Sequence, residues 1–241
     1  MSDWEKRLIL KVYAGSISYG TNTKDSDEDF RGICIPDKNV LLGLHTFETK
    51  EKRELGELDD VTYSLQKFVQ LALQNNPNIL DALFVANNHV AFINEFGKEL
   101  REIRKEFISK QAYKTYGGYA ISQLQRMTKV EKNATGKRAA LIEKYGYDTK
   151  NAMHLIRLLH MGIEILTEGE VHVLRHDNKY LIEIRNGKYT LSDIEDEYKH
   201  LKQLLDLAYV NSKIPNQPNF DKINSWLVDA HIRSLTWEGN K

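Results

Sequence analysis

The stretch AGSISYGTNTKDSDEDFRG, Ala14 to Gly32, is the most informative part of this sequence. It contains two carboxylates, Asp27 and Asp29, which are separated by one residue and therefore share one face of an extended strand. Two like charges so close together repel each other, and a divalent cation would offset that cost. Mg²⁺ prefers such hard oxygen ligands, combined with substrate phosphates and water. The pair therefore indicates a metal site, although a solvated surface turn would show the same spacing.

The residues before the carboxylates suit a phosphate group. Gly15 and Ser16 directly follow Leu8–Ala14, an apolar run that is typical of a buried strand. They offer backbone N–H groups, a hydroxyl and the conformational freedom for a tight turn. The residues between Ser16 and Asp27 suffice for a helical turn through Tyr19 and a return to the neighbouring strand. The stretch therefore predicts a phosphate-binding turn beside a metal site.

The composition limits the classes of function. The 241 residues carry 34 basic and 34 acidic side chains, so any contact with nucleic acid must use a local patch of charge. The single cysteine, Cys34, excludes an intramolecular disulfide and suggests a reducing compartment. The sequence shows no signal peptide and no apolar run of the roughly 20 residues that a spanning helix needs. We therefore expect a cytoplasmic protein with no membrane contact.

The periodicity of the sequence changes along the chain. Short strand-like runs bounded by turn residues continue to about Tyr63, and Ser64 is a candidate helix cap. The charge-rich segment Lys50–Asp60 is interpreted as a solvated loop. Farther along, the pattern is almost entirely helical, with candidate helices over Phe92–Ser109, Gln111–Lys129, Thr149–Glu168, Leu191–Ser212 and Asp221–Arg233. The predicted fold class is α+β: a small mixed-sheet domain, residues 1–91, followed by an all-helical domain, residues 92–241.

A two-metal site needs a third carboxylate, and two aspartates at the start of a later strand are candidates. If Val61 and Tyr63 pack inward, Asp59 shares their face and is buried at a cost. Asp60 faces the other way and can line a cleft. We therefore predict Asp60 as the third carboxylate, with Asp59 as the alternative.

The predicted helix Thr149–Glu168 carries a line of basic residues. At 100° per residue, Lys150, His154 and Arg157 fall within an arc of about 60°, broadly opposite the apolar stripe of the helix. From the spacing alone, the simplest interpretation is a solvated basic face.

Four blocks of the sequence together resemble a known family. They are GSISYGTNTKDSDEDFRGICIPD, DVTYSLQKFVQLALQNNPNILDALF, KNAMHLIRLLHMGIEILTEGE and YLIEIRNG, which run from about Gly15 to Gly187. The Gly-Ser pair followed by Asp-x-Asp resembles the DNA polymerase β-like nucleotidyltransferase superfamily. The longer blocks are similar to its RNA-ligase-associated, or YcgL-like, predicted nucleotidyltransferases. This resemblance implies a palm-like sheet that carries the carboxylates and a helical domain over the cleft.

The resemblance also implies the chemistry. It is the transfer of a nucleoside monophosphate from an NTP, such as ATP, to an acceptor hydroxyl, with release of pyrophosphate and with two Mg²⁺ ions (or Mn²⁺) as cofactors. By position, Asp27, Asp29 and Asp60 would be the catalytic and metal-binding residues. Gly15 and Ser16 would contact the triphosphate.

The resemblance further places the basic helix face in the cleft. Lys150 and Arg157 would then face the triphosphate or an acceptor phosphate, and His154 would be a polar contact or a proton carrier. Arg185 is a weaker candidate for the same cleft. Ile17 stands where the family motif often has a basic residue or a histidine, so no charged phosphate contact is expected there.

Three functions remain compatible with this reading of the residues. The leading one is a Mg²⁺-dependent nucleotidyltransferase, with an RNA end or tRNA as candidate acceptors that the sequence does not decide between. The alternatives are a catalytically inactive, nucleotide-sensing or partner-binding member of the fold, and an antitoxin-like enzyme that nucleotidylates a protein hydroxyl. The presence of all the acidic residues argues against an inactive protein, whereas the antitoxin-like enzyme would use the same donor site.

Overall fold

The computed structural model describes residues 4–24, 26–54, 58–128 and 136–240. The chain forms two compact units. The first contains the chain up to Ile108, the segment His172–Leu174 and the chain from Gln217 onward. The second contains Ser109–Val171 and Arg175–Asn216. These units group residues by packing, so the predicted functional division into residues 1–91 and 92–241 stays a prediction.

The first unit is built on a five-stranded mixed sheet with the strand order β3-β4-β2-β1-β5. The strands are β1 (Leu8–Ala14), β2 (Glu28–Cys34), β3 (Thr49–Glu54), β4 (Leu58–Ser64) and β5 (Val90–Ile93). β2 and β4 run parallel, whereas β1 pairs antiparallel with both β2 and β5, and β3 pairs antiparallel with β4. The expected mixed sheet in the N-terminal part, followed by helices, is therefore confirmed.

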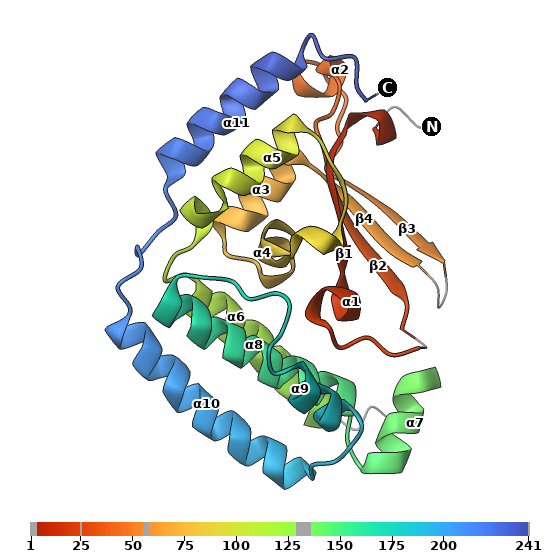
Figure 1. The fold of residues 1–241 in the computed structure, drawn as a ribbon, viewed down its shortest axis with the longest axis vertical. Helices are drawn as coiled ribbons and strands as arrows, with labels where there is room; N and C mark the ends of the chain where they lie inside the picture. Colours follow the sequence, from red (N-terminus) through yellow and green to blue (C-terminus); the bar gives the residue numbers. More distant parts are fainter. Residues whose placement is uncertain (1–3, 25, 55–57, 129–135, 241) are drawn as a thin grey trace. The chain divides into compact units, whose positions relative to one another are not determined.

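Helices cover one side of this sheet (Figure 1). They are α3 (Leu65–Leu73), α4 (Pro77–Phe84) and α5 (Glu95–Glu102). The ring of Phe68 in α3 lies 6.2 Å from that of Tyr63 in β4, and Leu65 and Leu80 are fully buried. The remaining elements of the unit are α1 (Gly15–Tyr19), α2 (Lys38–Leu41), α11 (Phe220–Ser234) and the 3-10 turns η1 (Glu5–Arg7), η2 (Asn87–His89) and η3 (Arg104–Phe107).

The second unit is helical. Its elements are α6 (Ala112–Thr128), α7 (Gly136–Tyr145), α8 (Thr149–Glu168), α9 (Asn178–Arg185) and α10 (Leu191–Asn211). The central helix is α8, which packs against α6, α9 and α10. A Cβ added at Gly162 would lie 3.1 Å from atoms of both Tyr116 and Leu205, so this glycine allows the close approach of three helices. No described helix is sufficiently long and apolar to cross a membrane.

Two helix ends follow the sequence signals. Ser64 caps α3, since its side chain accepts a hydrogen bond from the Lys67 backbone N–H at 3.2 Å. Gly169 ends α8 in a left-handed conformation with φ 69°. The cap predicted at Ser64 is therefore confirmed.

Two predictions of secondary structure are wrong. The charged segment predicted as a loop forms β3 and begins β4, with residues 55–57 outside the described part. The predicted helix Phe92–Ser109 begins instead with the end of strand β5, and α5 follows at Glu95. Both β3 and β5 lie at the edges of the sheet, where charged or short strands are common because only one side is paired.

Candidate active site

The structure brings Gly15 against the carboxylate of Asp29. β1 ends at Ala14, whose partner across the antiparallel pair is Asp29. A Cβ built on Gly15 would lie only 1.9 Å from Oδ2 of Asp29, and Gly15 has φ +59°, in the left-handed region that favours glycine. The space and the backbone conformation therefore both require glycine next to this carboxylate.

The helix α1 holds this turn in place. It begins at Gly15, and its C-terminal cap, Gly20, is left-handed with φ 70°. The Ser18 hydroxyl donates a hydrogen bond to the Gly15 carbonyl at 2.8 Å. The Tyr19 hydroxyl donates to a carboxylate oxygen of buried Asp81 in α4 at 2.5 Å. The helical turn expected after the Gly-Ser pair is present, and α4 anchors it.

The parallel pairing of β2 with β4 decides which later aspartate lies beside Asp29. Asp29 is in register with Asp59, and neighbouring side chains in register share one face of the sheet. The side chain of Asp59 is 36% exposed and lies 3.3 Å from a guanidinium nitrogen of Arg31. Asp27 lies one residue before β2 and is half-buried.

Asp60 points to the opposite face. It is in register with Phe30, and its Oδ2 lies 2.6 Å from Nζ of Lys11. The same ammonium group lies 4.6 Å from the centre of the Phe30 ring. Asp60 is therefore paired with Lys11 on the face opposite to Asp29, and its choice over Asp59 as the third carboxylate stays a prediction.

The carboxylates do not form a complete metal site by themselves. Among the described residues, no group of three His, Cys, Asp or Glu side chains is close enough to hold an ion. Asp29 and Asp59 nevertheless supply two oxygen donors on one face, next to a glycine that leaves room. Mg²⁺ is commonly bound by one or two carboxylates and completes its shell with substrate phosphates and water. The donor set therefore fits a divalent ion that binds together with a nucleotide.

The basic residues of α8 do not form a solvated face. Lys150 is exposed and His154 is half-buried, but Arg157 is only 5% exposed. An Nη1 hydrogen of Arg157 points at the sulfur of Met161, 3.2 Å away. Burial, as the largest cause, lowers the pKa of His154 to about 3. His154 is therefore neutral near pH 7, and its predicted role stays a prediction.

A second polar centre in the helical unit had no signal in the sequence spacing. Arg175 is fully buried and donates two hydrogen bonds to Glu164, at 2.5 and 2.7 Å, and one to Asp177 at 2.8 Å. Nδ1 of His160 lies 2.6 Å from the other oxygen of Asp177. Burial acts to raise the pKa of Asp177, but the hydrogen bonds from His160 and Arg175 outweigh it and lower that pKa. The network ties the segment before α9 to α8.

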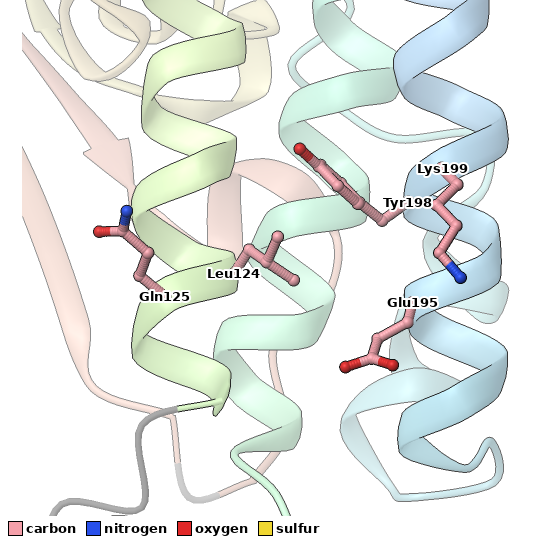
Figure 2. Close-up of a pocket in the computed structure, with 5 residues that line it drawn as sticks. All are labelled: Leu124, Gln125, Glu195, Tyr198 and Lys199. Carbon is pink, nitrogen blue, oxygen red and sulfur yellow. The ribbon is translucent and has the colours of Figure 1, made fainter.

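Two surface hollows lie in the helical unit, and none of the predicted site residues lines them. Figure 2 shows the first, of about 290 Å³, with Leu124 and Gln125 on α6 and with Glu195, Tyr198 and Lys199 on α10. The second, of about 310 Å³, lies beside the Arg175 network and is lined by His160, Ile163, Glu164, His176, Asp177, Leu201 and Leu204.

The first strand of this mixed sheet ends in a Gly-Ser turn that lies against a carboxylate of the Asp-x-Asp motif. This combination is typical of one class of proteins, the nucleotidyltransferases related to DNA polymerase β. The family model described as RlaP, RNA repair pathway DNA polymerase beta family, matches residues 2–229. The chain belongs to this family of polymerase β-type nucleotidyltransferases, which is linked to RNA repair. The resemblance stated from the sequence blocks is confirmed.

Individual relatives are more distant. An uncharacterized 38.9 kDa protein in the nrdC–mobD intergenic region of Enterobacteria phage T4 is 30% identical over 130 residues, which cover 50% of this chain and 38% of the phage protein. The uncharacterized protein YcgL of Bacillus subtilis is 25% identical over 109 residues, covering 44% of this chain and 41% of YcgL. The matches thus span about two-fifths of these relatives. A crystal structure of a nucleotidyltransferase-like protein from Exiguobacterium sibiricum is 11% identical, with a TM-score of 0.31 over 94% of this chain and 74% of the other.

Proposed function

We propose that this protein is a Mg²⁺-dependent nucleotidyltransferase that transfers a nucleoside monophosphate from an NTP to a hydroxyl group at an RNA end. The acceptor oxygen forms a bond to the α-phosphorus, the bond from that phosphorus to the β-phosphate oxygen breaks, and the acceptor proton passes to solvent. Pyrophosphate leaves. The observation that carries this proposal is the contact between Gly15 and Asp29, which leaves glycine as the residue that fits.

Each residue of the site has a role in this proposal. Asp29 and Asp59 hold the divalent ions from one face of the sheet, and Asp27 adds a carboxylate from the chain just before β2. When bound, such ions stabilise the charges on the attacking and leaving oxygens. Gly15 and Ser16 present backbone N–H groups and a hydroxyl to the triphosphate.

Arg31 orients the third carboxylate. Its guanidinium donates to both the backbone carbonyl and the carboxylate of Asp59, at 3.2 and 3.3 Å. A carboxylate held in this way keeps its direction, which is what a metal ligand requires. In this proposal Asp59 takes the place predicted for Asp60.

The test is a transfer reaction with each α-³²P-labelled NTP and Mg²⁺ or Mn²⁺, against total RNA and against total protein. We expect label in RNA, loss of that label in the Asp29→Asn and Asp59→Asn variants, and its retention in Asp60→Asn. Label in protein instead would support the antitoxin-like alternative. Binding of NTP without any transfer, in the presence of both acceptor pools, would support an inactive nucleotide-binding protein and refute the proposal.

A further inference from the structure

The helix α1, which carries the Gly-Ser turn of the candidate active site, is too short to hold its own position. It has five residues, Gly15–Tyr19, whereas isolated helices shorter than about 12 residues are marginal in water. Its first residue directly follows β1, so the sheet fixes that end. Residues 22–24, beyond its C-terminal cap, are exposed, and the hydrogen bonds of Thr23 lead to Ser26 within the same loop. The attachment of the other end of α1 must therefore come from elsewhere.

The side chain of Tyr19 supplies this attachment. Its hydroxyl donates a hydrogen bond of 2.5 Å to Oδ2 of Asp81 on α4, 62 residues away in the sequence. That length is typical of a bond from a hydroxyl to a carboxylate, about 2.5–2.7 Å, which is stronger than a bond between neutral groups. The two residues are only 5% and 6% exposed. Because water has little access to either group, breaking the bond is costly.

The partner helix α4 is itself fixed at its start. It begins at Pro77, whose ring suits the first helical position, and the Asn76 side chain caps it by accepting a hydrogen bond from a backbone N–H at 3.1 Å. Just before the cap, Asn75 is fully buried and donates a side-chain hydrogen bond to the Phe107 carbonyl at 2.6 Å. α4 also packs against β1. Asp81 is therefore a fixed point to which α1 is attached.

Hydrogen bonds within α1 connect Tyr19 to the Gly-Ser turn. The neighbouring Ser18 hydroxyl donates to the Gly15 carbonyl at 2.8 Å, and the Thr21 backbone N–H donates to the Ser16 carbonyl at 2.9 Å. Both carbonyls of the turn are thus bonded to residues within two positions of Tyr19. Gly15 leaves no room for a Cβ beside the candidate metal-binding carboxylate, so a small movement of the turn changes that contact.

We propose that Tyr19 and Asp81 are positioning residues of the candidate active site, and that their hydrogen bond holds the Gly-Ser turn where it contacts the triphosphate of the NTP. No covalent bond forms or breaks. The identity of the ligand rests on the proposed function, whereas the attachment of α1 to α4 does not. Without the hydrogen bond, α1 occupies several positions, and the apparent affinity for NTP falls with the fraction of molecules in the binding position.

The direct test is the Tyr19→Phe variant, which removes the donor and keeps the ring. If the binding position falls to about a tenth of the population, KM for NTP rises about tenfold. Saturating NTP selects the binding position, so kcat should stay near the wild-type value. A loss of folded protein alone would instead lower kcat and leave KM unchanged, which would overturn the proposal. Calorimetry with a non-hydrolysable NTP and Mg²⁺ should show the same loss of affinity without any reaction.

Variants of Asp81 separate position from stability. Combining Tyr19→Phe with Asp81→Leu removes both polar groups, so the double variant should resist urea better than Tyr19→Phe alone and yet bind NTP as weakly. Recovery of both stability and affinity would overturn the positioning role. Asp81→Asn keeps an oxygen that can accept the bond, so it should bind NTP more tightly than Asp81→Leu. Equal affinities in these two variants would also count against the proposal.

Tyr147→Phe is the matched control in the helical unit. Tyr147 is 3% exposed, and its hydroxyl donates a hydrogen bond to the Tyr189 carbonyl at 2.7 Å. The variant therefore loses a comparable hydrogen bond of a buried tyrosine, and it should lose stability while keeping its affinity for NTP. An equal loss of NTP affinity in Tyr147→Phe and Tyr19→Phe would show a general effect of destabilisation and would refute the positioning role.

Hydrogen exchange without nucleotide keeps this inference distinct from the proposed function. In Tyr19→Phe the Thr21 amide, which bonds to the Ser16 carbonyl, should exchange faster than in the wild-type protein, whereas in Tyr147→Phe it should not. Faster exchange in a protein that transfers no nucleotide would refute the proposed function and support the attachment of α1. Unchanged exchange in Tyr19→Phe would refute the attachment, even in a protein with active transfer.

Discussion

Replacing Gly15 by alanine tests the contact on which the candidate active site rests. The structure sets two costs. A left-handed backbone with φ +59° is unfavourable by about 1–2 kcal/mol for a residue with a Cβ. The new Cβ would also lie 1.9 Å from Oδ2 of Asp29, whereas real Cβ contacts are essentially never shorter than 3.0 Å, so the carboxylate must move by about 1 Å. Misplacing a catalytic group by about 1 Å lowers a rate on the order of 100-fold.

The Gly146→Ala variant separates the cost of the left-handed backbone from the effect of the contact with Asp29. Gly146 has φ +81°, and nothing lies within 4 Å of the position that a Cβ would take there, so this variant carries the backbone cost alone. Urea unfolding should therefore show a loss of about 1–2 kcal/mol in Gly146→Ala and at least that in Gly15→Ala. Electron paramagnetic resonance should show weaker Mn²⁺ binding, in the presence of a non-hydrolysable NTP, only in Gly15→Ala. Equal Mn²⁺ affinity in both variants would refute the role of Asp29 in holding metal.

Four other variants have defined outcomes. Asp27→Asn and Asp29→Asn should each lower transfer more than about 100-fold with a nearly unchanged melting temperature, because each removes a ligand charge and also relieves repulsion; normal activity in both would exclude the two-metal mechanism. Arg175→Met should lower the free energy of unfolding by about 3–5 kcal/mol in urea titrations, because two carboxylates lose a buried partner; a loss below about 1 kcal/mol would mean that the network is dispensable. His154 stays neutral in the folded protein down to about pH 3 but takes up a proton below about pH 6.5 once unfolded. The free energy of unfolding should therefore decrease as the pH is lowered from about 6.5 towards 3, by about 2 kcal/mol at pH 5. The His154→Asn variant should lack that part of the pH dependence.

The sequence signals that succeeded are local. The apolar run before Gly15 forms β1, and the turn after it forms α1, because a strand end and a tight turn depend on residues next to one another. The limits of α8, Thr149–Glu168, agree with the prediction for the same reason. The side chain of Asp148 caps its first turn and Gly169 ends it, and both residues adjoin the helix in sequence.

The signals that failed depend on neighbours in space. β3 carries alternating charges that are typical of a loop, and it is a strand because it pairs with β4 along its whole length. β5 is only four residues long, and its pairing with β1 outweighs the helical pattern that begins in it. The Arg175 network is also invisible in the sequence, because Glu164 and Asp177 meet Arg175 only after α8 and the segment before α9 have packed together.

The choice between Asp59 and Asp60 shows most clearly what periodicity leaves undetermined. Alternation along β4 requires the two aspartates to face opposite sides, but only the register with β2 reveals that Asp59 shares a face with Asp29. Asp60 is the better candidate only if the face of Val61 is buried along the whole strand. Exposure on that face changes from 36% at the Asp59 side chain to 5% at Val61, whereas the Asp60 side chain on the other face is 10% exposed. A carboxylate can therefore share a face with the core and still reach solvent, provided that it lies at the end of the strand, and this is where Asp29 and Asp59 lie.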